Sequence, residues 1–122
     1  MKILVADDDP EQLGIRCMLL EQSGFETIQA SDGLAAMKIA CEKSPDCAVI
    51  DLRLPTEELG LQLIRNLRTL RRSMRLIVLT GGDPQHFAAH PESELVDELI
   101  VKGSPAGHLV AKLKTFAAGA RG

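Results

Sequence analysis

Five short apolar runs alternate with helix-period segments along the whole chain, and this alternation limits the folds that it can adopt. The runs are KILVA (2–6), FETIQA (25–30), CAVID (47–51), RLIVLT (75–80) and ELIV (98–101). Each is bounded by Asp, Gly, Ser or Pro, as strands commonly are. Because strands that alternate with helices are joined by right-handed crossovers, the pattern predicts an α/β fold: a doubly wound parallel sheet with helices on both faces. We expect the strand order 2-1-3-4-5.

Helix-period spacing of apolar residues places helices between these strands. They are expected to begin at Pro10 with Asp9 as the cap, near Leu34, after Gly60 and near Pro105. The segment between the fourth and fifth strands is weaker, because PQHFAAH (84–90) provides about two helical turns before Pro91 interrupts it. We therefore expect the fourth helix to be short or broken.

The composition favours one domain and argues against a nucleic-acid-binding surface. A chain of 122 residues, 45% of them hydrophobic, supplies one core and leaves no room for a second domain. The net charge of -3 and the pI of about 5.6 disfavour binding to nucleic acid through net basicity. We interpret the one basic stretch, RNLRTLRRSMR (65–75), as a solvated helix face carrying Arg65, Arg68 and Arg72.

The cysteines and the N-terminal segment indicate a reducing compartment. Cys17, Cys41 and Cys47 are odd in number and lack C-x-x-C spacing, so we expect free thiols rather than disulfides or zinc ligands. The apolar run before the acidic cluster is too short for a signal peptide, and no run approaches membrane-spanning length. We expect a cytoplasmic domain that makes no membrane contact.

Polar side chains stand where four of the five predicted strands end. Asp7, Asp8 and Asp9 follow the first strand, Asp51 closes the third, Thr80 closes the fourth and Lys102 follows the fifth. In such a sheet these ends share one edge, where ligands bind beside the switch point between strands one and three. Converging carboxylates suit Mg²⁺, and a lysine and a hydroxyl opposite them suit the oxygens of a phosphoryl group. We expect Asp9 to serve only as a helix cap.

The fragments ILVADDD, VIDLRLP, LT and VK stand in this order at successive strand ends, and with them the chain resembles the receiver domain of two-component response regulators, a flavodoxin-like fold. The resemblance implies that Asp51 is the phosphoacceptor, taking a phosphoryl group from a sensor histidine kinase, a phosphotransfer protein or a small acyl phosphate. It implies that Mg²⁺ binds Asp8, Asp51 and the backbone carbonyl of Arg53 directly, and Asp7 through a water molecule. Thr80 and Lys102 would hold the phosphoryl oxygens.

The resemblance also implies how such a domain acts. It assists its own phosphorylation and dephosphorylation without being an enzyme for other substrates, and it switches its interaction with a downstream protein partner or a fused output domain. Direct nucleic-acid binding is not expected, whereas a phosphorylation-dependent homodimer through the last helix is a family-level implication. Residues 1–118 form the receiver domain, and residues 119–122, the end of AAGARG, form a tail or linker stub.

The chain departs from the usual receiver pattern at three places. Leu99 stands where an aromatic residue commonly couples to the threonine, and the chain has no Tyr or Trp. Gly103 stands where proline usually follows the lysine, so the cis bond of that proline is not expected. The stretch PTEELG (55–60) is one residue longer than usual.

The pair Gly81–Gly82 leaves space beside Thr80. We expect water to reach the acyl phosphate through this space and to shorten its lifetime.

Two other functions compete with a phosphorylation switch. A non-switching pseudo-receiver would dock constitutively through its fourth helix and fifth strand. A haloacid-dehalogenase-like phosphatase would use Asp7 as nucleophile and Asp9 as acid and base, although the short chain leaves little room for a substrate-gripping cap. We see no metal-ligand spacing among His86, His90 and His108, and expect them at the surface.

Overall fold

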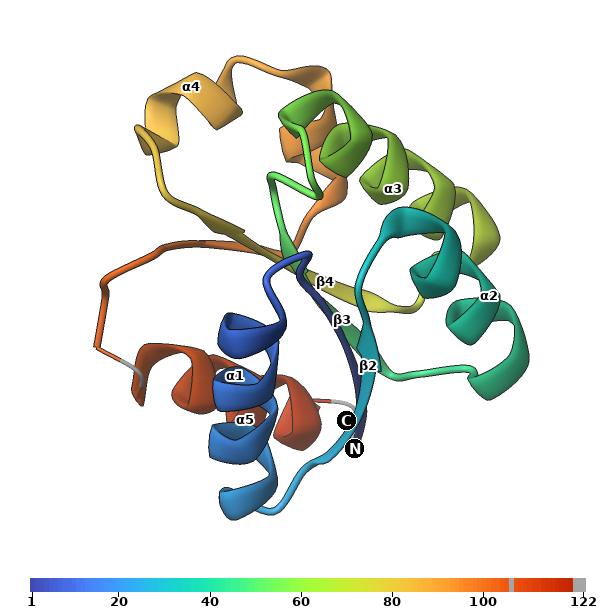
Figure 1. The fold of residues 1–122 in the computed structure, drawn as a ribbon, viewed down its shortest axis with the longest axis vertical. Coiled ribbons are helices and arrows are strands. Elements are labelled where there is room, and N and C mark those ends of the chain that lie inside the picture. The colour runs from blue at the N-terminus through green and yellow to red at the C-terminus, as the bar shows by residue number, and fades with distance from the viewer. Residues whose placement is uncertain (106, 120–122) are drawn as a thin grey trace.

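The computed structural model describes residues 1–105 and 107–119, which form one parallel sheet flanked by helices (Figure 1). The strands are β1 (Lys2–Ala6), β2 (Glu26–Ala30), β3 (Cys47–Asp51), β4 (Arg75–Thr80) and β5 (Glu98–Val101). They pair in parallel in the order β2-β1-β3-β4-β5. The predicted doubly wound order is therefore confirmed.

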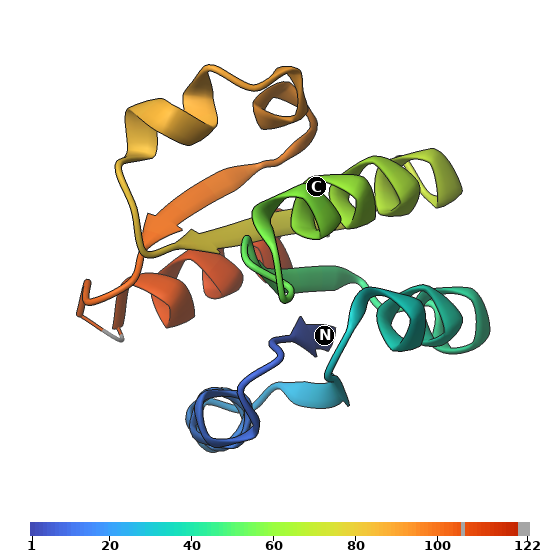
Figure 2. The same ribbon diagram turned by 45° about the horizontal axis from the view of Figure 1, so that its top comes forward.

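The helices cover both faces of this sheet. They are α1 (Pro10–Gln22), α2 (Gly33–Lys43), α3 (Glu57–Leu70), α4 (Pro84–Ala88), a 3₁₀ turn (Pro91–Leu95) and α5 (Gly107–Gly119). Figures 1 and 2 show α1 and α5 on one side of the sheet and α2, α3 and α4 on the other. In the described part of the chain, none of these helices combines the length and apolarity that a membrane crossing requires.

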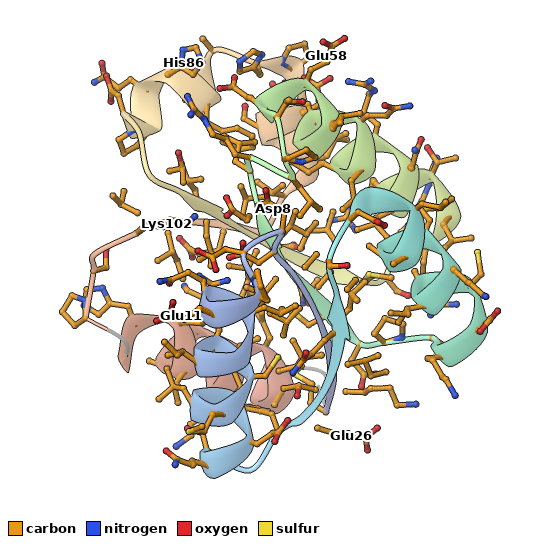
Figure 3. All side chains as sticks on the ribbon, in the orientation of Figure 1. Asp8, Glu11, Glu26, Glu58, His86 and Lys102 are labelled. Atoms are coloured by element: carbon orange, nitrogen blue, oxygen red, sulfur yellow. The ribbon has the colours of Figure 1, made fainter. Side chains whose placement is uncertain are left out.

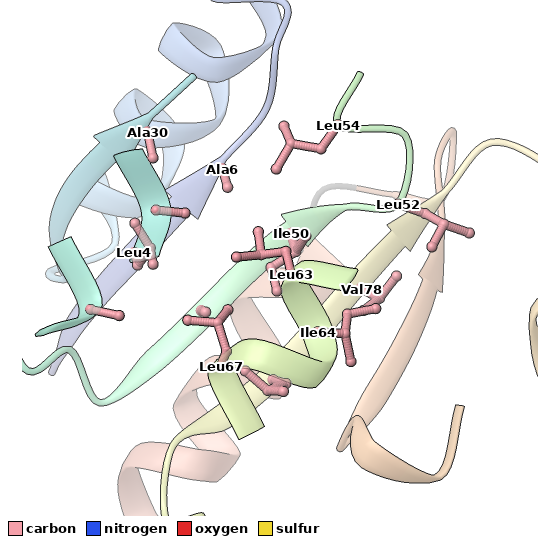
Figure 4. Close-up of a cluster of buried hydrophobic side chains, with 14 of the residues drawn as sticks. Leu4, Ala6, Ala30, Ile50, Leu52, Leu54, Leu63, Ile64, Leu67 and Val78 are labelled. Carbon is pink, nitrogen blue, oxygen red and sulfur yellow. The ribbon is translucent and has the colours of Figure 1, made fainter. Parts of the chain in front are cut away.

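Two hydrophobic clusters result from the alternation of side chains along the strands. In β1, Leu4 and Ala6 point into the cluster under α2 and α3, whereas Ile3 and Val5 point into the cluster under α1 and α5. Figure 4 shows the first cluster, in which side chains of α3 lie over β3 and β4. Because both faces are covered, the central strands are apolar at nearly every position, as the sequence indicated.

Helix α3 begins earlier than the sequence predicted. It starts at Glu57 rather than after Gly60, because the Thr56 hydroxyl accepts a hydrogen bond from the Leu59 amide at 3.2 Å and caps the first turn. Gly60 lies inside the helix, directly against the loop that follows β3. A Cβ added there would stand only 2.7 Å from the carbonyl carbon of Leu52, so glycine is needed for close approach and not for a turn.

The segment between β4 and β5 is short and broken, as predicted. Helix α4 has five residues, is capped by Asp83 and buries Phe87 against the α3 side of the sheet. Pro91 then starts the 3₁₀ turn. Arg68 holds the far end of this segment: its guanidinium donates to the carbonyls of Leu95 and, through another nitrogen, Met74, at 2.6–2.9 Å.

The expectation of a solvated arginine face is wrong for Arg68. Besides those carbonyls, its side chain donates to the carbonyl of Arg72 at 2.8 Å and to the carboxylate of Asp97 at 3.2 Å. Arg65 is more exposed and pairs with Glu92 of the 3₁₀ turn. The basic stretch therefore joins α3 to the segment that precedes β5.

The cysteines are free, as predicted, but they differ in exposure. Cys17 and Cys47 are buried, and Cys41 is exposed at the end of α2. Burial raises the pKa of the Cys47 thiol to about 12. Helix α5 continues through Gly119, whereas positions 120–122 of the predicted tail lie outside the described residues. The domain boundary after residue 118 stays a prediction.

Candidate functional site at the carboxyl edge of the sheet

Three aspartates converge at the carboxyl edge of the sheet. Asp7 and Asp8 follow β1, Asp51 ends β3, and carboxylate oxygens of the three lie within 4.8 Å of one another. Asp7 is 1% exposed and Asp51 5%, whereas Asp8 faces solvent. Because β1 and β3 are neighbours, strand order alone brings these side chains together. Figure 3 shows Asp8 and Lys102 at this same edge.

The two oxygens of Asp51 have separate partners. Lys102 Nζ lies 2.6 Å from Oδ2, and the Arg53 amide donates to Oδ1 at 3.1 Å. Burial raises the pKa of Asp51 above its ordinary value; the Lys102 ammonium opposes that shift, and the nearby Asp7 charge adds to it. The site therefore gathers negative charge around one buried acid and places one lysine against it.

Asp9 occupies the role that the sequence predicted for it. Its carboxylate accepts from the Glu11 amide at 3.0 Å and the Gln12 amide at 3.4 Å, and so caps α1. A carboxylate engaged at a helix end is a poor candidate for the acid and base of the phosphatase alternative. Asp7 Oδ1 in turn accepts from the Asp9 amide at 2.9 Å, which fixes the turn between β1 and α1.

Arg16 is a site residue that the sequence reasoning missed. Its Nη1 lies 2.8 Å from Asp7 Oδ2, and its side chain is 11% exposed. The signal was present, because Arg16 is three residues after Leu13 and four before Leu20, on the buried face of α1. An arginine on a buried helix face requires an acidic partner, and the edge of the sheet supplies one.

Thr80 and the two glycines after it border the open side of the site. Thr80 is buried, and its hydroxyl oxygen accepts from the Gly82 amide at 3.1 Å. A cavity beside it is lined by Asp51, Leu52, Arg53, Glu57, Thr80, Gly81, Gly82, Asp83, His86 and Lys102. A Cβ at Gly81 or Gly82 would have its nearest neighbour at 3.9 Å, so the space above Asp51 is open.

The departures from the receiver pattern have local explanations. Gly103 has a φ of +91°, a conformation that proline, fixed near −65°, is unable to adopt. The cis peptide bond of the described chain precedes Pro55, in the loop after β3, and of PTEELG, residues 57–60 belong to α3, with Thr56 as its cap. Leu99 is half-buried and packs against the cluster under α3.

The donor set at this edge fits a hard divalent cation and an anionic ligand next to each other. Carboxylate oxygens within 4.8 Å of one another suit Mg²⁺, which takes one or two protein carboxylates and keeps several waters. Lys102 and the Thr80 hydroxyl, on the β4–β5 side, suit the oxygens of a phosphoryl group. Every residue predicted for the site is placed at this edge, although the side chain of Arg53 is exposed.

Comparisons with known proteins agree with this arrangement. The sequence profile of the response regulator receiver domain matches residues 3–114. The virulence regulator BvgA of Bordetella pertussis is 40% identical over 88 residues, which cover 71% of this chain and 42% of that protein. A putative transcriptional regulator of Pseudomonas aeruginosa is 37% identical over 89 residues, with the same coverage. The chain thus spans about two fifths of the length of these curated relatives.

Two solved structures give the same result for the fold. A receiver domain from Clostridium thermocellum superposes with a TM-score of 0.88 at 27% identity, covering 98% of this chain and 96% of that one. The response regulator TrrA of Thermotoga maritima, solved in complex with Mg²⁺ and BeF, has a TM-score of 0.85 at 27% identity, covering 94% and 97%. This chain belongs to the response regulator receiver domain family.

Proposed function

We propose that this domain accepts a phosphoryl group on Asp51 and so switches its interaction with a downstream partner or a fused output domain. The observation that carries the proposal is the surroundings of Asp51: a buried carboxylate between Lys102, 2.6 Å away, and the carboxylates of Asp7 and Asp8. The donor is a sensor histidine kinase, a phosphotransfer protein or a small acyl phosphate. The domain assists its own phosphorylation and dephosphorylation and is not an enzyme for other substrates.

In the proposed transfer, a carboxylate oxygen of Asp51 attacks phosphorus as the bond from phosphorus to the donor nitrogen or oxygen breaks. The donor leaves with that electron pair, and an aspartyl phosphate forms. Lys102 already lies against Asp51 Oδ2, so its ammonium is placed to pair with a negatively charged phosphoryl oxygen once the phosphoryl group is on Asp51. The Thr80 hydroxyl borders the same cavity and is placed to donate to a second oxygen.

Mg²⁺, when bound, neutralises charge between the carboxylate and the phosphoryl group. We propose that Asp8, Asp51 and the backbone carbonyl of Arg53 hold it directly and that Asp7 acts through a water molecule. The Arg16 guanidinium pairs with Asp7 Oδ2, which supports an indirect role for that carboxylate. Asp8, which is exposed, keeps its oxygens available to an ion from solvent.

Intact-mass spectrometry after incubation with acetyl phosphate and Mg²⁺ tests the proposal. We expect one added phosphoryl group on the wild-type chain, none on Asp51→Asn, and none without Mg²⁺. Asp32→Asn is the matched control, because it changes an exposed aspartate to another good cap of α2. If neither a phosphoryl adduct nor binding of beryllofluoride depends on Asp51, the phosphoacceptor proposal is wrong and constitutive docking replaces it.

The open space above Asp51 supports a further part of the proposal, a short-lived aspartyl phosphate. Gly81→Ala and Gly82→Ala fit without overlap, since the nearest atoms to the added Cβ lie 3.9 Å away. These methyl groups narrow the path of the attacking water, so we expect the phosphorylated form to last longer in the double variant. An unchanged half-life by the same mass measurement would contradict this role of the glycines.

A further inference from the structure

We propose that Glu57, His86 and His90 form a second metal site, for Zn²⁺, where α3 meets α4. The Nε2 atoms of His86 and His90 lie 2.9 and 2.8 Å from the same oxygen, Oε1 of Glu57. One ligand atom from each of these residues lies within 4.8 Å of the others. Among the described residues, Asp7, Asp8 and Asp51 form the other group with this property. The proposal does not rest on phosphorylation of Asp51.

The arrangement of these atoms suits a tetrahedral ion. Zinc bonds to histidine nitrogen and carboxylate oxygen are about 2.0–2.2 Å long, which separates neighbouring ligand atoms by roughly 3.3 Å. Each Nε2 therefore needs to move only a few tenths of an ångström from the Glu57 oxygen, and one ring nitrogen of each histidine lies within 4.8 Å of the other's. The two imidazole rings stand at 86° to each other with centroids 5.2 Å apart, so their nitrogens approach one point from different directions.

The sequence offered no metal-ligand spacing among the histidines, but the structure brings His86 and His90 to one carboxylate. His86 lies in α4 and His90 lies just after it, where the chain has left the helix. The His90 amide donates to the carbonyl of Phe87 at 2.9 Å, and this turn brings both imidazoles to the same oxygen of Glu57. The sequence did not point to their partner, because Glu57 lies 29 residues before His86 and reaches the site from another helix. His108 is exposed on α5 and is not a member of the trio.

The protein fixes these ligands from two elements. Phe87, between the two histidines in the sequence, is buried and anchors α4, and the His90 amide donates to its carbonyl at 2.9 Å. Glu57 stands in the first turn of α3, which Thr56 caps. The His86 side chain is 63% exposed, so an ion has access from solvent, and three protein ligands leave a fourth position for water.

The type of ligand atom distinguishes this site from the three aspartates, because the two sets prefer different metals. Two imidazoles and one carboxylate favour Zn²⁺ and other late transition metals, whereas a set made only of oxygens favours Mg²⁺. Hydrogen bonds alone are the alternative explanation of the contacts: each imidazole would then carry a proton on Nε2 and donate it to Glu57. A metal requires the opposite, since the Nε2 lone pair is the ligand.

Titration of the metal-free full chain with Zn²⁺ against a chromophoric chelator tests the proposal. We expect one strongly bound Zn²⁺ per chain in the presence of excess Mg²⁺. His86→Ala, His90→Ala and Glu57→Gln are each expected to weaken binding at least about tenfold. His108→Ala and Cys41→Ser are matched controls that change an exposed potential ligand elsewhere and should not alter the affinity. Zinc binding that is absent, or equally strong in all three variants, overturns the proposal.

Two further readouts keep the result unambiguous. Asp51→Asn should bind Zn²⁺ like the wild type, so failure of the phosphoacceptor proposal and failure of the zinc proposal are distinguishable. In ¹⁵N spectra of the imidazoles, zinc should shift the Nε2 signals of His86 and His90 while that of His108 stays in place. If Nε2 of both residues remains protonated with Zn²⁺ present, the contacts are hydrogen bonds only and no zinc site exists.

Discussion

Replacing Gly60 by alanine should destabilise the domain, although alanine is the better helix former. The added Cβ would overlap the carbonyl of Leu52, with 2.7 Å to its carbon, whereas carbon atoms in contact normally stand about 3.5–4.0 Å apart. The Leu52 carbonyl oxygen lies nearer to that Cβ than its carbon does, and these atoms are backbone and not a flexible side chain, so α3 must move away by more than about 1 Å. Overpacking of this kind lowers the free energy of unfolding by about 1–3 kcal/mol, and the higher helix propensity of alanine offsets about 1 kcal/mol of that loss.

Gly14→Ala in α1 is the matched control for this effect. Gly14 has no atom within 4 Å of its added Cβ, so only the propensity gain applies, and we expect about 0.5–1 kcal/mol of stabilisation. Urea unfolding followed by far-ultraviolet circular dichroism measures both, since the chain has no Trp or Tyr for fluorescence. The two effects leave a net loss of up to about 2 kcal/mol, which lowers the midpoint of Gly60→Ala by up to roughly 1 M urea. If both variants gain stability, the close approach of α3 to Leu52 is refuted.

Three other predictions concern residues of the core and its edges. Arg68→Ala should lower the free energy of unfolding by about 2–4 kcal/mol in urea titrations, because charge-assisted hydrogen bonds to Met74 before β4 and to Leu95 and Asp97 before β5 are lost. Arg72→Ala, at an exposed position, should stay within about 0.5 kcal/mol. Because burial raises the pKa of Asp51, Asp51→Asn should stabilise the fold at pH 7. Unfolding curves should show this gain shrinking as the pH falls through the raised pKa of the folded state, and no gain should be left below the ordinary value of 3.8, where the acid is protonated in both states. A thiol reagent at pH 8 should modify Cys41 quickly and the two buried cysteines only in denaturant; fast reaction of Cys47, whose pKa is raised to about 12, would contradict its burial.

The fold and most of the acidic edge could be predicted because their signals are local. Each strand is an apolar run with its own boundary residues, and parallel order brings the residues after each run to one edge. The start of α3 was missed because the capping role of Thr56 competed with the usual reading of Gly60 as a boundary. Glycine also permits close packing, and only the loop lying against α3 distinguishes the two uses.

The contacts of long side chains could not be predicted in this way. Arg68 meets Asp97 across 29 residues, and His90 meets Glu57 across 33. Such pairs depend on how α3 is placed against the segment before β5. The spacing of apolar residues along the sequence does not determine that placement. Arg16 differs, because its place on the buried face of α1 is visible in the sequence once the helix is accepted.

Arg68 holds one end of the segment between β4 and β5, whereas the other end has open space around it. At the amino edge of the sheet, Arg68 binds Asp97, whose carboxylate also accepts from the Leu76 amide at the start of β4, so Asp97 ties the segment before β5 to β4. At the opposite edge the chain leaves β4 through Gly81–Gly82, with open space around both glycines. Between these ends α4 is held by buried Phe87 and by the contacts of His86 and His90 with Glu57, so the open stretch of residues 81–97 is the Gly81–Gly82 pair that borders Asp51. We therefore expect a change of charge at Asp51 to displace this glycine pair before it disturbs the pairing of β4 with β5.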